Sequence, residues 1–506
     1  MALPVTPTPP RSSRRQRALV PVLVSTCMLV AVVSSLGAPL IPAISIEDHV
    51  SPSGAQWSLT VTLLVGAVTT PAMGRLGDGP RRRQAILLGL TGVGAGSLLA
   101  ALPLGFGWLI AGRALQGVGM GLVPLAIATA RDALPAERAR SSVAVLSLTT
   151  SVGVGLGYPL TGLLAQVLGL YAAFWFAAAA AAAAWAAAFM VLPPPPQRPA
   201  HRMDVLGMLL LTVGMGGMLL ALSQAELWGW SSARLLVLAG VSLVVLAWWV
   251  VHESRTSHPL VNVRLIRDRT VLVADLTTMV GGVGMYLLMS SVTRFVQTPR
   301  SAGYGFGGSV LVTGLALVPF SAASLAAGRL ARALTRRMPL AGLLPLGGLV
   351  SLAAMLCFTF LRGSLFGVFV AMALAGLGVG LNFAATPGLI VTAVPVHETG
   401  SAMSFNQVAK YIGYSTGSAL AAAVLQAYTA PGGSLPSDAG FSAIGALGCG
   451  VGAVTALASL PLIRSRHCGA RDGLTAGLPR QQAWRAHGTS PLPRAADTSP
   501  TRGSGT

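Results

Sequence analysis

The chain consists largely of apolar runs that are each long enough to cross a lipid bilayer as a helix. The hydrocarbon core of a bilayer is about 30 Å thick, which about 20 helical residues span. Water cannot satisfy backbone groups in that layer, so such runs fold as helices. We predict fourteen spans, at residues 18–40, 57–73, 84–103, 107–128, 142–168, 171–192, 205–225, 233–251, 270–296, 307–327, 340–361, 365–394, 402–428 and 440–463.

Composition agrees with an all-α polytopic membrane protein. Hydrophobic residues make up 53% of the 506 residues and charged residues only 9%, whereas soluble domains carry about 25% charged residues. The net charge of +20 does not indicate nucleic-acid binding, because the basic residues lie in links and tails rather than on one folded face. The four cysteines show no metal-ligand spacing, so we expect no metal site.

The placement of the basic residues predicts an orientation. Cytoplasmic links of membrane proteins are rich in Lys and Arg. With the N-terminus inside, the inner links and tails hold 28 of the 34 basic residues, the outer side holds three, and three lie within spans. The run 18–40 is too long for the apolar region of a signal peptide. We therefore expect a multi-pass protein of the cytoplasmic (cell) membrane with both termini cytoplasmic.

An internal repeat relates the two ends of the chain. Leu115–Leu122 is similar to Leu374–Leu381 at an offset of 259 residues, and Gly153 and Gly157 match Gly413 and Gly417 at 260. Spans 1–6 therefore correspond to spans 9–14, with spans 7 and 8 inserted between them. Parallel repeats of this kind are typical of secondary transporters built from two bundles.

The repeat also predicts the domain organisation. The expected parts are a basic cytoplasmic tail at 1–17, an N-terminal six-helix bundle at 18–192, a Pro-rich cytoplasmic linker at 193–204, an inserted helix hairpin at 205–252, a basic cytoplasmic linker at 253–269, a C-terminal six-helix bundle at 270–464 and a disordered cytoplasmic tail at 465–506.

Several motifs resemble those of one transporter family. The arginine-rich turn Gly74–Arg83 is similar to the signature loop of the major facilitator superfamily, and Arg113–Gly119 resembles the arginine motif of its fourteen-span drug:proton antiporter branch. Gly153–Gly162 resembles the antiporter motif of that branch, although Pro159 comes one residue late and Thr161 replaces a glycine. Leu222–Trp230 and His258–Val261 are also similar to the branch.

The resemblance implies a secondary active transporter that exports amphipathic drugs or metabolites by proton antiport with alternating access. Such multidrug efflux contributes to antibiotic resistance. It needs no cofactor, because the proton gradient supplies energy, and its partners are a small-molecule substrate, protons and the bilayer. We do not expect an enzyme, because no nucleophile–base pair is visible. Val33 stands where the branch usually carries an Asp. That departure leaves two alternatives open: a facilitator or importer without proton coupling, and a non-transporting membrane sensor.

The resemblance implies a cytoplasmic gate formed by Gly74, Asp78, Arg82 and Arg83. Asp78 would pair with a helix end or an arginine across the interface, in one state only. The alternative is a static cap in which Asp78 neutralises the neighbouring arginines.

Three charged residues inside the spans are candidates for the substrate or proton pathway. Arg113 lies within a span, where a charge costs at least about 2.5 kcal/mol, so it faces a cavity or a partner, with Gln116 on the same helix face. The alternative is a structural donor to backbone carbonyls. Lys410 either lines the cavity or extends toward the inner interface.

Asp275 is the only acidic residue well within a span. Burial away from water disfavours a charged carboxylate, which suits a proton carrier. The alternative is a pairing with Arg267, Arg269 or the N-terminus of its own helix.

The glycines of the antiporter-like motif predict close helix packing. Gly153 and Gly157 have small-xxx-small spacing, which lets two helices approach closely. We assign Gly153, Gly157, Pro159 and Gly162 to this packing role, in which bending and packing functions coincide.

Overall fold

The computed structural model describes residues 14–50, 52–194, 204–256, 268–430, 435–460 and 462. The first bundle contains α1 (Arg14–Ser35), α2 (Gly37–Glu47), α3 (Pro52–Asp78), α4 (Arg82–Ala101), α5 (Phe106–Val118), η1 (Gly119–Gly121), α6 (Leu122–Ala133), α7 (Ala136–Leu168) and α8 (Ala172–Val191). The hairpin is α9 (Val205–Trp228) and α10 (Ala233–Arg255). The remaining elements are α11 (Arg269–Gln297), η3 (Arg300–Ala302), α12 (Val310–Leu334), η4 (Leu340–Gly342), α13 (Leu343–Leu361), α14 (Leu365–Ala393), η5 (Val396–Glu398), α15 (Thr399–Ala427) and α16 (Asp438–Ser459).

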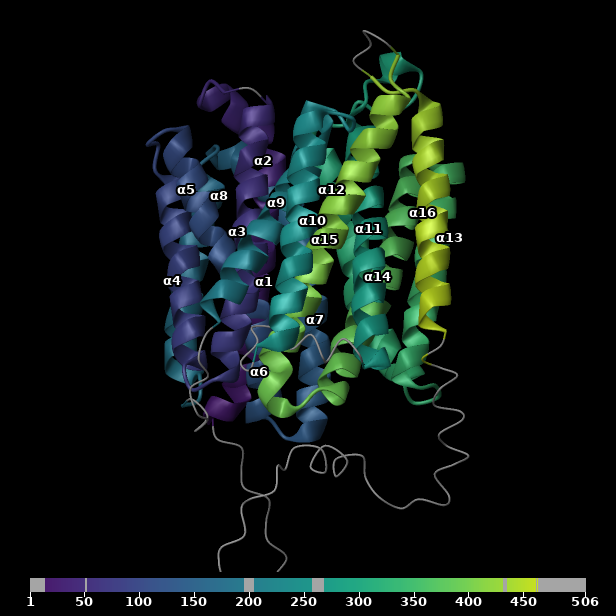
Figure 1. Ribbon diagram of the computed structural model, residues 1–506. Helices are drawn as coiled ribbons and strands as arrows, with labels where there is room; N and C mark the ends of the chain where they lie inside the picture. The colour runs from purple at the N-terminus through teal and green to yellow at the C-terminus, as the bar shows by residue number, and fades with distance from the viewer. Residues whose placement is uncertain are drawn as a thin grey trace, which may run out of the picture. The chain divides into compact units, whose positions relative to one another are not determined.

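The long helices run side by side along nearly one direction (Figure 1). Successive long helices are joined by short connections, so the chain passes alternately between the two ends of the bundle. We name the end that carries the α3–α4 turn, Gly79–Arg81, the arginine-turn end; it is the lower end in Figure 1. The N-termini of α11 and α15 and the C-termini of α6 and α8 lie at the same end.

The predicted all-α polytopic fold class is confirmed. Within the described residues, thirteen helices are long and apolar enough to cross a membrane. The fourteenth predicted span corresponds to α15, which has 29 residues but carries polar side chains such as Asn406, Gln407 and Lys410 in its first half. The described residues form no strand beyond one isolated bridge between Thr429 and Pro436.

The structure divides two of the predicted spans. The first span ends at Ser35, and α2 follows it as a separate helix up to Glu47. The fourth is interrupted by the 3-10 turn Gly119–Gly121 between α5 and α6. A Cβ at Gly117 would lie 2.6 Å from the carbonyl oxygen of Thr62. The glycines of this region therefore let its backbone pack directly against α3.

Residues Met1–Leu462 form one compact unit, and residues 463–506 lie outside the described part. Within the unit, the first half (α1–α8) and the second half (α11–α16) meet through α3 against α15 and through α7 against α12 and α14. Helix α9 contacts both α3 and α15, so the inserted hairpin touches both halves.

The predicted domain boundaries stay a prediction. The two linkers fall partly, and the motif His258–Val261 wholly, outside the described residues.

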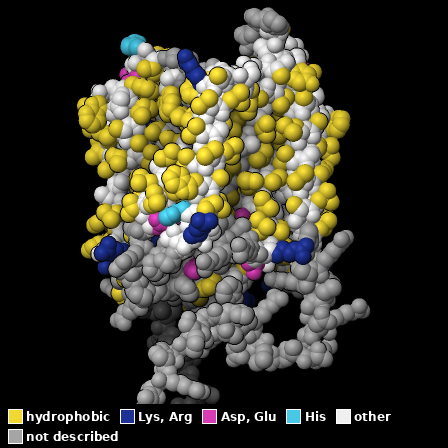
Figure 2. Space-filling model, in the orientation of Figure 1, with side chains coloured by type: hydrophobic (Ala, Val, Ile, Leu, Met, Phe, Trp, Pro, Cys, Tyr) yellow, Lys and Arg dark blue, Asp and Glu magenta, His cyan; other side chains and the backbone are white. Residues whose placement is uncertain are grey.

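The outer surface of the bundle is apolar. Figure 2 shows hydrophobic side chains covering most of the visible face, with most of the visible Lys and Arg side chains gathered toward its lower edge. Large side chains such as Phe360, Leu88 and Val244 are 77%, 68% and 69% exposed. A surface of this kind is stable next to lipid chains and would be unfavourable in water.

Candidate functional site: the interface between the two halves

Asp78 joins the two halves at the arginine-turn end. It is the last residue of α3 and is fully buried. Its Oδ1 accepts a hydrogen bond from the backbone N–H of Gly400 at 2.7 Å. Its Oδ2 accepts from the backbone N–H of Ser401 at 2.9 Å and from the Ser401 hydroxyl at 2.6 Å. The first N–H groups of a helix lack partners within it and carry partial positive charge, so the carboxylate stabilises the start of α15.

A close backbone approach of α3 and α15 accompanies this contact. A Cβ at Gly74 would lie 1.9 Å from the Ser404 hydroxyl and 2.8 Å from the Gly400 carbonyl oxygen. A Cβ at Gly400 would lie 2.6 Å from the Gly74 carbonyl oxygen. Both distances are far shorter than van der Waals contact. Glycine at 74 and at 400 therefore allows the two halves to close on one another.

Arg131 provides a second contact between the halves, which sequence reasoning missed. It lies in the last turn of α6 and donates to the Thr399 hydroxyl, and its Nη2 donates to the Val394 carbonyl oxygen at 3.1 Å. Both acceptors flank the start of α15 in the second half. A signal was available, because Asp132–Pro135, directly after Arg131, matches Thr392–Pro395 at the repeat offset of 260 residues.

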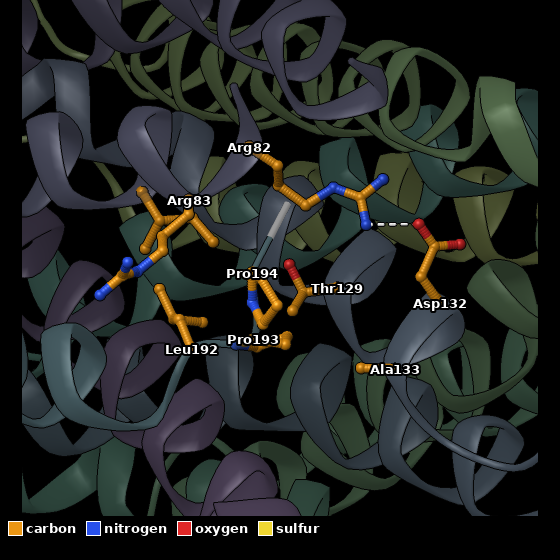
Figure 3. A pocket seen from close by; sticks show the side chains of 9 residues that line it. Arg82, Arg83, Thr129, Asp132, Ala133, Leu192, Pro193 and Pro194 are labelled. Atoms are coloured by element: carbon orange, nitrogen blue, oxygen red, sulfur yellow. Dashed lines mark hydrogen bonds and ion pairs between the residues drawn. The ribbon is translucent and has the colours of Figure 1, made fainter. Parts of the chain in front are cut away.

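Arg82 and Arg83 do not cross to the second half through any described contact. Arg82 is 4% exposed and forms an ion pair with Asp132 of α6 at 2.5 Å, and Arg83 donates to the Phe189 carbonyl oxygen of α8 at 2.8 Å. Figure 3 shows the Arg82 and Asp132 side chains reaching toward one another while Arg83 points the opposite way. They border a pocket of about 200 Å³ with Pro193 and Pro194. In this conformation both arginines brace the first half internally.

Arg113 is fully buried between α1, α3 and α5. Its Nε donates to the Ser58 carbonyl oxygen at 2.7 Å, and its Nη1 donates to the Val33 carbonyl oxygen at 3.0 Å. Nη1 also donates to Oε1 of Gln116 at 2.6 Å, which places the two side chains together as their spacing predicts. No carboxylate of the described residues pairs with Arg113. The contacts are those of a structural donor, and a pathway role for Arg113 stays a prediction.

Asp275 lies between α11 and α15 and is 5% exposed. Its Oδ1 accepts from the Asn406 side-chain amide at 2.8 Å, and that amide also donates to the Thr278 hydroxyl at 3.1 Å. Oδ2 is buried and accepts no hydrogen bond from the described residues. None of the arginines in the described part forms an ion pair with Asp275, which leaves this oxygen free to hold a proton.

A narrow cavity of about 40 Å³ lies between the halves at mid-depth. The first half contributes apolar groups such as Val30 and Met120, and the second half contributes Gln407 and Tyr411. Tyr286 and Tyr414 also line it, with ring centroids 4.4 Å apart in a stacked arrangement. Sequence reasoning missed these tyrosines, although polar aromatic residues near Lys410 inside a span were a usable signal.

Lys410 is 5% exposed and lies one helical turn from the lining residue Gln407 on α15. Its Nζ donates to Oε1 of Gln407 at 3.3 Å, and Gln407 in turn donates to the Tyr411 hydroxyl at 3.0 Å. The Lys410 ammonium also lies 4.1 Å from the centroid of the Phe383 ring. The structure thus links Lys410 to two residues that line the cavity.

Residues of the antiporter-like motif pack α7 against two neighbouring helices, α1 and α12. A Cβ at Gly153 would lie 2.5 Å from the Ala31 Cβ, and one at Gly157 would lie 1.9 Å from the Ser35 hydroxyl, so both glycines lie against α1. The repeat partners Gly413 and Gly417 pack α15 against α11 in the same way, where a Cβ would lie 2.2 Å from a backbone carbonyl oxygen.

Two other residues of the motif face the second half. A Cβ at Gly155 would lie 1.8 Å from the Ser321 hydroxyl of α12. A Cβ at Gly314 of α12 would lie 3.1 Å from the Cα of Pro159. Gly162 is buried within α7. The motif therefore serves the crossing of α7 and α12 as well as the packing on α1.

Two halves with matching helix packing around a central cavity, each built from membrane-length helices, form the architecture of secondary transporters. The sequence model of the Major Facilitator Superfamily matches residues 23–205 and 198–418. The chain belongs to the Major Facilitator Superfamily of membrane transporters.

Relatives of known name agree with this family. The Multidrug resistance protein Stp of Mycobacterium tuberculosis is 30% identical over 77% of this chain and 72% of its own length. The Tetracenomycin C resistance and export protein of Streptomyces glaucescens is 26% identical over 78% of this chain and 73% of its own. The structure of the human organic anion transporter MFSD10 superposes with a TM-score of 0.62 over 89% of this chain and all of that one. Its 18% identity shows the fold alone.

Proposed function

We propose that the protein exports amphipathic small molecules from the cytosol across the cell membrane in exchange for protons. The names of its relatives, which include a multidrug resistance protein and an export protein, support this class of substrate. The contact of Asp78 with the start of α15 is the observation that carries the transport mechanism. Its hydrogen bonds hold the two halves together at the arginine-turn end, and separation of the halves would break them.

Alternating access would use this contact as the gate. The arginine-turn end is cytoplasmic in this proposal, because the basic residues gather in its links. In the described conformation Asp78 and Arg131 close that end, and opening toward the cytosol would break both sets of bonds. A hydrogen bond to a charged group contributes about 1.5–3 kcal/mol. A handful of such bonds is enough to set the balance between the two states.

Asp275 would carry the proton. Its Oδ2 has no donor among the described residues, and its Oδ1 already has the Asn406 amide. Protonation of Oδ2 would remove the buried negative charge between α11 and α15. Because α15 also receives Asp78, a change at Asp275 acts on the helix that forms the gate. The proton gradient is the energy source, since one charge moving across 100 mV releases about 2.3 kcal/mol.

Proteoliposomes containing the purified full-length protein test this proposal. An imposed pH gradient is expected to accelerate dye transport several-fold, and Asp275→Asn is expected to remove that acceleration while leaving downhill flux. Asp268→Asn is the matched control, because Asp268 is an exposed cap of the same helix. Equal flux with and without the gradient in the unaltered protein would remove proton coupling and leave transport.

One observation favours a second candidate, a facilitator without proton coupling. Val33 stands where the antiporter branch usually carries an Asp, and Arg113 donates to the Val33 backbone instead of to a carboxylate. Among the described residues, the buried guanidinium of the first half then has no carboxylate partner. A gain of proton coupling in Val33→Asp, with no coupling in the unaltered protein, would support the facilitator.

A further inference from the structure

Lys410 is the only lysine in the chain; the other 33 basic residues are arginines. Those arginines lie mainly in links and tails, whereas Lys410 lies inside α15, in the second half of the molecule. Helix α15 packs against α3 and α6 of the first half, so the single lysine lies on a helix of the interface between the halves.

The described residues give this ammonium no counter-charge. Its partners are the neutral Oε1 of Gln407 and the face of the Phe383 ring. A lysine carries three N–H donors, so two remain without an acceptor among these contacts. A buried charge is costly unless it is paired. An anion that entered beside Lys410 would gain a charge-assisted hydrogen bond and would relieve this cost.

The surrounding interior is short of negative charge. Among the described residues, no carboxylate forms an ion pair with Lys410, and Asp275 has its Oδ1 bonded to Asn406. The second half contributes Tyr286, Tyr411 and Tyr414, with Gln407, to the wall of the central cavity. Aromatic rings pack in stacked or edge-to-face arrangements, so these rings offer a surface to planar aromatic ligands. The ammonium of Lys410 disfavours positively charged ones.

We propose that the central site takes planar aromatic molecules that carry a negative charge, with Lys410 as their counter-charge and the tyrosines as the stacking surface. This inference rests on the proposed export function, whose substrate class it narrows. The ammonium of Lys410 lies within hydrogen-bond distance of the lining residue Gln407, and it would repel a cationic ligand in this cavity with only the Gln407 oxygen and the aromatic rings to offset the repulsion.

Two dyes of one ring system provide the test. Fluorescein and rhodamine 6G share a planar xanthene core, but fluorescein is an anion at pH 8 and rhodamine 6G a cation. Full-length protein in proteoliposomes is expected to transport fluorescein saturably and with the lower KM. Lys410→Gln is expected to raise the KM for fluorescein at least about tenfold, the usual loss for one charge-assisted hydrogen bond. Lys410→Arg is expected to restore it, and rhodamine 6G flux is expected not to fall in Lys410→Gln.

A binding measurement on the unaltered protein tests the proposal without any substitution. Because the chain has one lysine, protein labelled with lysine that carries ¹³C at Cε gives a single side-chain NMR signal. That signal is expected to shift with fluorescein and to stay in place with rhodamine 6G. Preferred transport and binding of rhodamine 6G would overturn the anion proposal and leave export intact. A shift with fluorescein without transport of either dye would overturn export and keep the anion site.

Discussion

Arg113 Nη1 donates a hydrogen bond to the backbone carbonyl of Val33 at 3.0 Å, which ties α5 to α1. In the antiporter branch that this chain resembles, an Asp usually stands at the position of Val33. Here the described partners of the guanidinium are all neutral: the Val33 and Ser58 carbonyls and the Gln116 side chain.

Replacing Arg113 by Ala is expected to destabilise the protein. It would leave the buried Gln116 amide oxygen without its donor and remove the guanidinium from the Ser58 and Val33 carbonyls, which keep Thr62 and Leu36 as donors. An unsatisfied buried polar group costs about 1–3 kcal/mol, so a loss of that size is expected. Thermal unfolding of the purified protein measures it, with the exposed Arg234→Gln as control. An unchanged unfolding temperature in Arg113→Ala would contradict the structural role.

Replacing Asp78 by Asn is expected to open the arginine-turn end. The amide cannot accept both backbone N–H groups and the Ser401 hydroxyl with the strength of a carboxylate. Loss of about 1.5 kcal/mol or more from the closed state shifts the balance toward the open state at least about tenfold. A cysteine placed at the buried Ser404, in a protein without other cysteines, is expected to react faster with a maleimide in Asp78→Asn.

Asp132→Asn is the matched control for that experiment. Asp132 forms its ion pair with Arg82 inside the first half. Its loss is therefore expected to leave the labelling rate at position 404 within about twofold of the unaltered protein, as for a partly buried pair away from the interface. Equal acceleration in both variants would mean that Asp78 does not act on the interface specifically.

Gly74→Ala is expected to hinder closure by volume instead of by charge. The added Cβ would lie 2.8 Å from the Gly400 carbonyl oxygen and 2.7 Å from the Ser404 Cβ, so the two helices would have to separate. We expect transport to fall by about tenfold or more, with normal amounts of protein in the membrane. Gly79→Ala serves as control, because its Cβ would meet nothing closer than the Leu76 carbonyl oxygen at 3.7 Å. Equal activity of both variants would argue against a tight α3–α15 contact.

Gly155→Val is expected to impair transport through the crossing of α7 and α12, where the two halves also meet. Even its Cβ would lie 1.8 Å from the Ser321 hydroxyl and 3.2 Å from the Ser321 Cβ of α12. Because overpacking costs about 1–3 kcal/mol, turnover is expected to fall by about tenfold. Gly107→Val, at a position with open space around its Cβ, is expected to retain full turnover. If Gly155→Val kept the turnover of the control, the crossing of α7 and α12 would have no role in the transport cycle.

The apolar runs predicted the helices because a 20-residue apolar segment has one stable structure in lipid. The spacing of Arg113 and Gln116 also predicted their shared face, because it depends only on helix period. The contact of Asp78 with Gly400 could not be predicted from local sequence pattern, because 322 residues separate the partners. A pairing of that kind depends on how two bundles dock, which local periodicity does not encode.

The central tyrosines illustrate the same limit. Tyr286 and Tyr414 lie on different helices, and only the crossing of α11 and α15 brings their rings to 4.4 Å. The sequence placed Lys410 within a span but left open whether its side chain lines the cavity or extends toward the cytoplasmic membrane surface. Gln407 is its neighbour in the sequence, but the contact with Phe383 became apparent only from the structure.

The central cavity of about 40 Å³ has further meaning for how a cargo enters. That volume accommodates little more than a single water molecule, whereas drug-sized ligands occupy about 300–1,000 Å³. In the described conformation a drug-sized cargo would not fit, so the helices that line the cavity would have to move apart before it could be held there. The closed form would then reject large cargo, and only a form with separated walls would admit it.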